Sequence, residues 1–127
     1  MSITEKMLCS KSHEYLLDNG DGTYTIGLTD YAVEQLGDIV FLELPETDSE
    51  YNKGETFATV ESVKAASEIY MHISGKIVEV NENAVDTPEI LNENNYEQGW
   101  LVKIQATGDA SEQSDLLDYE DYKEELE

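Results

Sequence analysis

The sequence of 127 residues contains no arginine, a single cysteine and only two prolines, and its seven basic residues are all lysines. A lone cysteine cannot form an internal disulfide, so the composition indicates a reducing compartment. Cys9 also lacks a CxxC partner, which argues against a redox role. Long apolar runs are absent as well, because no stretch approaches the roughly 20 apolar residues of a membrane span.

Positive charge is scarce, and the 29 acidic residues give the chain a formal net charge of −22. Such a chain repels phosphate backbones and anionic lipid, which argues against nucleic acids and membrane surfaces as partners. It attracts basic patches on other proteins and speeds their association. The segment Met1–Leu8 has neither the pattern of a secretory signal nor that of a transit peptide, so we expect a soluble cytoplasmic protein.

Recognisable catalytic and metal-binding motifs are also missing. His13 and His72 are the only histidines, and neither has the spacing of a metal-ligand set, so we expect structural or surface roles for them. The acidic, glycine-containing stretch 18–22 lacks the spacing of a calcium loop and is better explained as a turn. No phosphate loop, nucleophile elbow or Cys/His pair is present, so we predict no enzyme activity.

What the sequence does contain is a series of short strand patterns. Residues 15–17 and 24–28 flank the turn at 18–22 and predict a hairpin. Asp30 is placed to cap a short helix over residues 31–36, which Gly37 would end. The apolar run 39–42 then predicts a strand that is buried on both faces.

The stretch Val60–Glu68 lies at the centre of the chain and contains Lys64 among small residues. Strand patterns at 57–61 and 68–71 flank it, which places Lys64 at the tip of a hairpin. Local propensity allows either a helical turn or a type I turn there. The pattern Gly-x-Ile-Val occurs at 37–40 and again at 75–78, and it suggests two similar half-motifs around this hairpin.

The last third of the chain predicts two helices and one strand. Thr87 as cap and Pro88 in the first turn predict a short helix through Leu91. The alternation over residues 100–104 predicts a strand. Residues 111–127 predict an acidic amphipathic C-terminal helix whose apolar stripe packs on the rest of one domain that spans residues 1–127.

These features together resemble the glycine cleavage H-protein family. The carrying segments are Ser12–Glu14, Thr29–Ala32, Gln35–Phe41, Glu43–Glu46, Val60–Ser67, Ser74–Asn81 and Gly99–Ile104. The string Val-Glu-Ser-Val-Lys-Ala-Ala-Ser at 60–67 is the most specific, since lipoyl domains of ketoacid dehydrogenases typically show Asp-Lys-Ala and biotin carriers Met-Lys-Met at this place.

The resemblance implies a mainly β fold, the hybrid barrel-sandwich of two small antiparallel sheets with short helices and a C-terminal helix. It implies lipoic acid attached to Lys64 through an amide. Glu61 and Gly75 would be read by the lipoylating enzyme. Glu14, and with it Glu68, would line the cleft in which the loaded arm rests.

The resemblance also implies a carrier that itself catalyses nothing. It would take the aminomethyl group of glycine from a pyridoxal-phosphate glycine decarboxylase and pass it to a tetrahydrofolate-dependent aminomethyltransferase. Dihydrolipoamide dehydrogenase, with FAD, would reoxidise the arm. A lipoate ligase or an octanoyl or lipoyl transferase would load it, and the free carrier is expected to be a monomer.

Five residues depart from the usual family pattern, and they leave alternatives open. Tyr15 replaces a tryptophan, Met71-His72 replaces Ser-Pro, Glu68 replaces an aspartate, and Asn95 replaces a proline. We expect these positions near the cleft or the hairpin. A lipoyl-bearing paralogue that serves lipoate relay or another redox system is therefore the main alternative, and an unmodified acidic adaptor is the third hypothesis.

Overall fold

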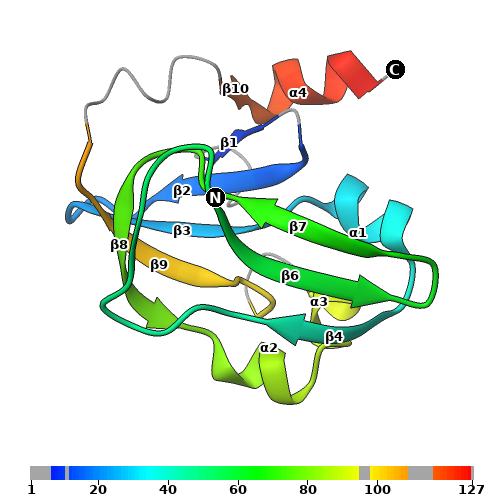
Figure 1. Ribbon diagram of the computed structural model, residues 1–127. Coiled ribbons are helices and arrows are strands. Elements are labelled where there is room, and N and C mark those ends of the chain that lie inside the picture. The colour runs from blue at the N-terminus through cyan, green and yellow to red at the C-terminus, as the bar shows by residue number, and fades with distance from the viewer. Residues whose placement is uncertain (1–6, 11, 95–97, 109–115, 127) are drawn as a thin grey trace.

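The computed structural model describes residues 7–10, 12–94, 98–108 and 116–126 as two antiparallel sheets with short helices at their edges (Figure 1). The strands are β1 (Met7–Cys9), β2 (Glu14–Asp18), β3 (Thr23–Leu28), β4 (Ile39–Glu43), β5 (Glu50–Tyr51), β6 (Thr56–Ser62), β7 (Ala66–Tyr70), β8 (Gly75–Val80), β9 (Val102–Ala106) and β10 (Leu117–Asp118). The helices are α1 (Asp30–Leu36), α2 (Glu82–Asp86), α3 (Ile90–Glu93) and α4 (Tyr119–Leu126). None of these helices, within the described ranges, has the length and apolar character to cross a membrane.

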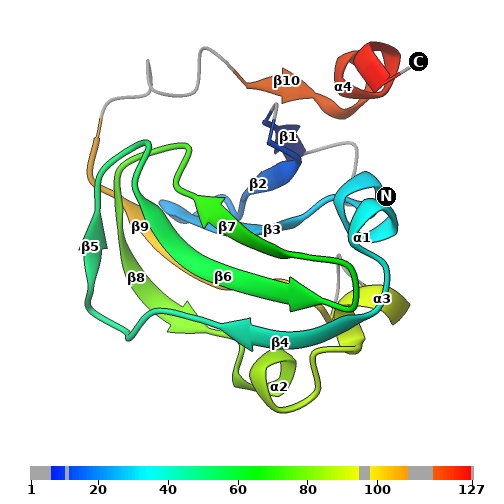
Figure 2. The same ribbon diagram turned by 45° about the vertical axis from the view of Figure 1, so that its right-hand side comes forward.

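The larger sheet has the strand order β10-β1-β2-β3-β9-β8-β5, and the smaller one has the order β4-β6-β7. Figure 2 shows the smaller sheet in front of the larger one. Apolar side chains from both sheets, among them Leu42, Val60, Ile77 and Ile104, fill the space between them. Burial of such side chains away from water is the main stabilising contribution to a fold of this size. The structure confirms the expected mainly β hybrid of two sheets.

Helix α1 begins one residue earlier than the sequence indicated. The side chain of Thr29, not of Asp30, accepts the hydrogen bond from the amide of Ala32, at 3.3 Å. Asp30 is the first helical residue, where its charge complements the positive end of the helix dipole. Gly37 ends the helix at φ 76°, as predicted. The prediction of the cap was wrong because Thr and Asp are both good caps, and two neighbouring candidates cannot be ranked locally.

Strand β4 is buried on only one face, so the expectation of a doubly buried strand was wrong. Ile39 and Leu42 are buried, whereas Val40 and Phe41 are 55% and 46% exposed. The ladder between β4 and β6 shifts register between Ile39 and Phe41, and this irregularity turns two successive side chains outward.

The two Gly-x-Ile-Val segments are structurally alike. In β8, Ile77 is buried, Val78 is exposed, and the ladder with β9 shifts register between Ile77 and Glu79. The same order of a buried Ile, an exposed Val and a register shift occurs in β4. The short repeat thus marks one equivalent strand in each sheet.

The segment after β8 differs most from the sequence-based expectation. Residues Glu82–Asp86 form α2, which no pattern indicated, and Thr87 ends that helix instead of capping the next one. The next helix, α3, begins only at Ile90, and its N-cap position is Glu89. Trp100 precedes β9 rather than belonging to it. Short helices of one turn depend on tertiary packing, which the local pattern does not contain.

The C-terminal helix is shorter than the predicted range of 111–127. Leu117 and Asp118 form β10 on the edge of β1, and α4 begins only at Tyr119. Tyr122 of α4 packs in a second apolar cluster with Met7, Cys9 and Tyr15, beside β1 and β2. The C-terminal segment therefore covers the β1 edge of the larger sheet (Figure 1). Residues 109–115 and 127 lie outside the described part of the chain.

Candidate functional site

Lys64 lies on the loop between β6 and β7, at the tip of the predicted hairpin. The amide of Ser62 donates to the carbonyl of Ala65 at 2.8 Å, so Val63 and Lys64 are the two central residues of the loop. Neither has a positive φ, which excludes the turn types that require glycine or asparagine. The ambiguity between a helical turn and a hairpin turn is therefore resolved in favour of the hairpin.

Ser62 holds this turn through its hydroxyl group. Its Oγ accepts hydrogen bonds from the amides of Lys64 and Ala65, each at 3.2 Å, and donates to the carbonyl of Ala65 at 3.1 Å. Serine supplies such local side-chain contacts in turns that lack glycine. The serine of the Val-Glu-Ser-Val-Lys string is thus the residue that fixes the backbone at Lys64.

The segment between α1 and β4 packs against the tip of the hairpin. The amide of Val63 donates to the carbonyl of Asp38 at 3.0 Å. A Cβ atom at Gly37 would lie 3.3 Å from Cε of Lys64, so the aliphatic stem of the lysine rests over this glycine. Both ribbon views show the hairpin tip beside α1 (Figures 1 and 2).

The amine of Lys64 is exposed and, among the described residues, has no carboxylate within salt-bridge distance. Its neighbours Ala65 and Ala66 are small and exposed, and they leave room for another protein around the amine. Glu61 is exposed on β6, opposite Phe41 on one side and Ala66 on the other. This arrangement suits a lysine that an enzyme must reach and acylate.

A cleft of about 180 Å³ opens between α1, the start of β2 and the inner face of the hairpin. Its apolar walls include Leu28, Ala32 and Val60, and its polar groups include Ser12 and Glu14. A small apolar slot with a few polar groups fits the end of an alkyl chain that carries a polar head.

Glu14 is the most deeply buried carboxylate of this cleft, with 2% exposure. Its Oε1 accepts hydrogen bonds from Ser10 Oγ at 2.8 Å and from Ser12 Oγ. His72 Nε2 lies 2.5 Å from the same oxygen. Hydrogen bonds from several donors compensate for the cost of burying a charge.

Glu68, the second carboxylate expected in the cleft, contributes to its lining but directs its carboxylate elsewhere. Its Oε2 accepts hydrogen bonds from Thr56 Oγ1 at 3.2 Å and from Tyr70 Oη at 3.4 Å. Strand alternation places Ser67 and Ile69 on the cleft side of β7 and Glu68 on the outer side. The structure thus brings Glu14, and not the carboxylate of Glu68, into the cleft.

Gly75 lies at the start of β8, beyond the end of the hairpin opposite to Lys64. A Cβ atom there would lie 2.8 Å from Cδ1 of Ile104 and 3.0 Å from the carbonyl oxygen of Gln105. Close packing against β9 is therefore a sufficient structural reason for glycine at this position. The structure does not bring Gly75 and Lys64 together.

Among the departures from the family pattern, Tyr15 and His72 lie in different parts of the structure, and Asn95 lies outside the described residues. Tyr15 is buried in the cluster under α4, and its ring covers Gly27, so its expected place beside the cleft was wrong. His72, by contrast, contacts Glu14 in the cleft. Sequence reasoning did not find this pair, because the two residues are 58 positions apart and no spacing rule connects them.

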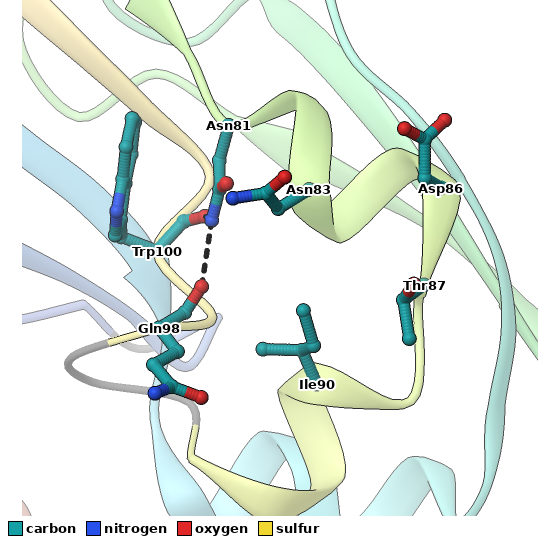
Figure 3. Close-up of a pocket in the computed structure, with 7 residues that line it drawn as sticks. All are labelled: Asn81, Asn83, Asp86, Thr87, Ile90, Gln98 and Trp100. Carbon is teal, nitrogen blue, oxygen red and sulfur yellow. Dashed lines mark hydrogen bonds between the residues drawn. The ribbon is translucent and has the colours of Figure 1, made fainter.

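A second and more polar pocket of about 600 Å³ lies on another part of the molecule, between α2, α3 and the start of β9 (Figure 3). The side-chain amide of Asn81 donates to the carbonyls of Gln98 and Trp100, both at 2.7 Å. No residue of its lining is shared with the cleft beside Glu14. In the described ranges, no group of three or more His, Cys, Asp or Glu residues is placed to hold a metal ion.

Comparison with known proteins identifies the family of the chain. The family model described as glycine cleavage H-protein matches residues 7–127. The chain is 57% identical over 111 residues to a glycine cleavage system H protein of Vibrio atlanticus, with 87% of each chain covered. It is 52% identical over 118 residues to the H protein of Vibrio vulnificus, with 93% of each covered. The crystal structure of the H protein from Mycobacterium marinum superposes with a TM-score of 0.85 at 35% identity, and the match covers 96% of this chain and 97% of that one. The chain therefore belongs to the glycine cleavage H-protein family.

Proposed function

We propose that Lys64 is the residue through which this chain carries lipoic acid, joined by an amide between Nζ and the lipoyl carboxyl group. Membership of the family makes the chain a lipoyl carrier of the glycine cleavage system. The observation that supports Lys64 most is its position: an exposed amine without a carboxylate partner among the described residues, at the tip of a firmly held hairpin.

We assign roles to the residues of the cleft and the hairpin from their geometry, and to Glu61 and Gly75 from the family resemblance. Lys64 anchors the arm, and Ser62 and Gly37 position that lysine. When bound, the lipoyl group supplies the disulfide that takes up the aminomethyl group. Glu14 is placed to pair with the amine of the loaded arm, and the apolar walls exclude water from its end. Glu61 and Gly75 serve as features that the lipoylating enzyme reads, and Glu68 forms part of the rim of the cleft.

The carrier works with several enzymes and catalyses no step of its own. Its clients are the pyridoxal-phosphate glycine decarboxylase, the tetrahydrofolate-dependent aminomethyltransferase and dihydrolipoamide dehydrogenase, and a lipoate ligase or transferase loads it. The net charge of −22 supports electrostatic steering toward basic sites on these partners. We place the protein as a monomeric single domain in the bacterial cytoplasm, as the bacterial origin of its relatives supports.

One observation favours a second function. His72 contacts the cleft carboxylate of Glu14, which suits a paralogue that carries lipoate without storing an amine. Reconstitution with the three glycine cleavage enzymes separates the two functions. The lipoylated chain should support glycine-dependent NADH formation, and Lys64→Arg, which keeps the charge but cannot be lipoylated, should abolish it. A fully lipoylated chain that supports no NADH formation would refute the first function and favour the second.

A further inference from the structure

We propose that His72 is a positioning residue that competes with the amine of the loaded arm for Glu14, and that protonation of His72 weakens retention of the arm. This inference rests on the proposed role of Glu14 in the cleft. It adds a pH-sensitive control of the arm that comes from a residue on a separate loop.

The hydrogen bonds at Glu14 leave little room for a further donor. One carboxylate oxygen, Oε1, contacts three donors: Ser10 Oγ at 2.8 Å, Ser12 Oγ, and His72 Nε2 at 2.5 Å. A carboxylate oxygen offers about two lone-pair sites. Oε1 is therefore already saturated, and an incoming amine gains full use of it only when one donor withdraws.

His72 is the donor best placed to withdraw. Ser10 is buried, and its Oγ also accepts a hydrogen bond from the amide of Glu14 at 3.0 Å. Ser10 therefore belongs to the turn that forms the site. His72 comes from the loop between β7 and β8, and its side chain keeps 16% exposure. Met71 and Ile73 on either side are buried and hold the backbone of this loop, so the ring can rotate while the loop stays in place.

The strength of the competition depends on the charge of the imidazole. With Glu14 ionised, neutral His72 donates one hydrogen bond, whereas protonated His72 adds the attraction of opposite charges in a partly buried setting. Of the other titratable groups that line the cleft, His13 contacts Tyr122 Oη at 2.8 Å, and Glu68 contacts Thr56 and Tyr70. In the described part of the chain, Glu14 is the one charged group that contacts the His72 ring.

The first experiment tests the pair in the unlipoylated full-length chain. Backbone amide NMR signals of Ser12 and Glu14 are followed between about pH 5 and 8, where ordinary histidines titrate. The measurement uses a His13→Asn background, because His13 lies between the two reporter residues and would give a step of its own. We expect a titration step at both amides that disappears when His72→Gln, a variant that keeps an N–H donor but cannot gain charge, is added. A step that persists in this variant would overturn the proposal.

The second experiment measures retention of the loaded arm. A glycine decarboxylase loads the lipoylated chain with the aminomethyl group of glycine and releases carbon dioxide, and the decarboxylase is then removed. Water hydrolyses the aminomethyl group to ammonia and formaldehyde and leaves the free thiol on the arm, and this loss is followed as released ammonia. Comparison with His72→Gln at each pH cancels the intrinsic pH dependence of that loss. We expect wild type to lose the group roughly two- to fivefold faster than the variant near the acid end, and at an equal rate near pH 8.

A rate ratio that stays constant with pH would overturn the role of His72. The variant Glu14→Gln separates this outcome from failure of the underlying function. If Glu14→Gln leaves the loss rate unchanged, Glu14 does not hold the arm, and the inference fails together with that assignment. If Glu14→Gln accelerates the loss while the ratio stays constant, the role of Glu14 stands and only the competition by His72 is refuted.

Discussion

Gly37 meets two structural requirements at a single position. It ends α1 at φ 76° and ψ −149°, a backbone region that is almost exclusive to glycine, and it lies beneath the stem of Lys64. The sequence predicted the first role from the position of glycine after a helix. The second role depends on contact between segments 27 residues apart, which local patterns do not contain.

The variant Gly37→Ala should lower the free energy of unfolding by about 1–3 kcal/mol, because alanine is strained in this conformation. Its Cβ should also displace the Lys64 stem and slow lipoylation. Gly54→Ala is the matched control: Gly54 also has a positive φ, 93°, but no atom lies within 4 Å of a Cβ placed there. Urea unfolding and a lipoylation assay check both variants. Equal lipoylation rates in the two variants would contradict the role of Gly37 beneath Lys64.

Individual strands were largely predictable because their alternating patterns reflect burial on one face. Both hairpins and the position of Lys64 at a loop tip are confirmed. The outward face of β4 was not predictable, since a register shift against β6 turns both Val40 and Phe41 to solvent. Helix α2 was missed because Ala84 is its one buried residue, which leaves no amphipathic pattern.

Of the candidate site, the sequence identified Lys64 and Glu14, and the structure added His72 and Ser62. Ser62 lay within the recognised motif, but its role appears only from the geometry of the turn. The Glu14–His72 contact joins β2 to the loop before β8. Only the packing of the two sheets brings these segments together.

Tyr122 joins helix α4 to the cleft region through two hydrogen-bond contacts of its hydroxyl group. Tyr122 Oη lies 2.8 Å from both Thr29 Oγ1 and His13 Nδ1. Thr29 caps α1, and His13 precedes Glu14, so the C-terminal helix contacts both segments that border the cleft. The element therefore stabilises the site without contributing a side chain to its chemistry.

Removal of this hydroxyl in Tyr122→Phe should lower the free energy of unfolding by about 1–3 kcal/mol, because Thr29 and His13 each lose a buried partner. Amide hydrogen exchange in α4 should become faster at the same time. Tyr119→Phe is the control, since the hydroxyl contact of Tyr119 with Asp30 is exposed and 3.4 Å long, and we expect a change within about 0.5 kcal/mol. Equal losses in both variants would show that Tyr122 does not fasten the helix.

At the scale of the whole molecule, the fold should lose stability in alkaline solution. Burial, reinforced by the charges of Asp30 and Asp118, raises the pKa of the Cys9 thiol from 9.0 to about 12. Burial likewise raises the pKa of Tyr122 from 10.0 to about 12. A raised pKa means that folding favours the protonated form of the group, and this preference adds to the free energy of unfolding. This stabilisation is complete below the unfolded-state values and is lost as the pH rises through the folded-state values.

The free energy of unfolding should therefore fall as the pH rises from about 9 to about 12. In Cys9→Ala the fall should begin nearer pH 10, where Tyr122 contributes together with Tyr15, whose pKa burial also raises. Urea unfolding at several pH values, followed by the fluorescence of Trp100, measures both curves. Curves of identical shape would contradict the contribution of the buried thiol. The high pKa also predicts that Cys9 stays unreactive toward thiol reagents in the folded protein near neutral pH.

The central claim is that the whole fold presents Lys64 for lipoylation. The most direct test is intact mass with peptide mapping of the chain expressed in a lipoylating host, beside Lys64→Arg as the control. We predict the mass increase of one lipoyl group, located on the peptide that contains Lys64 and absent from the control. A bare Lys64, or a lipoyl group on another lysine, would contradict the account.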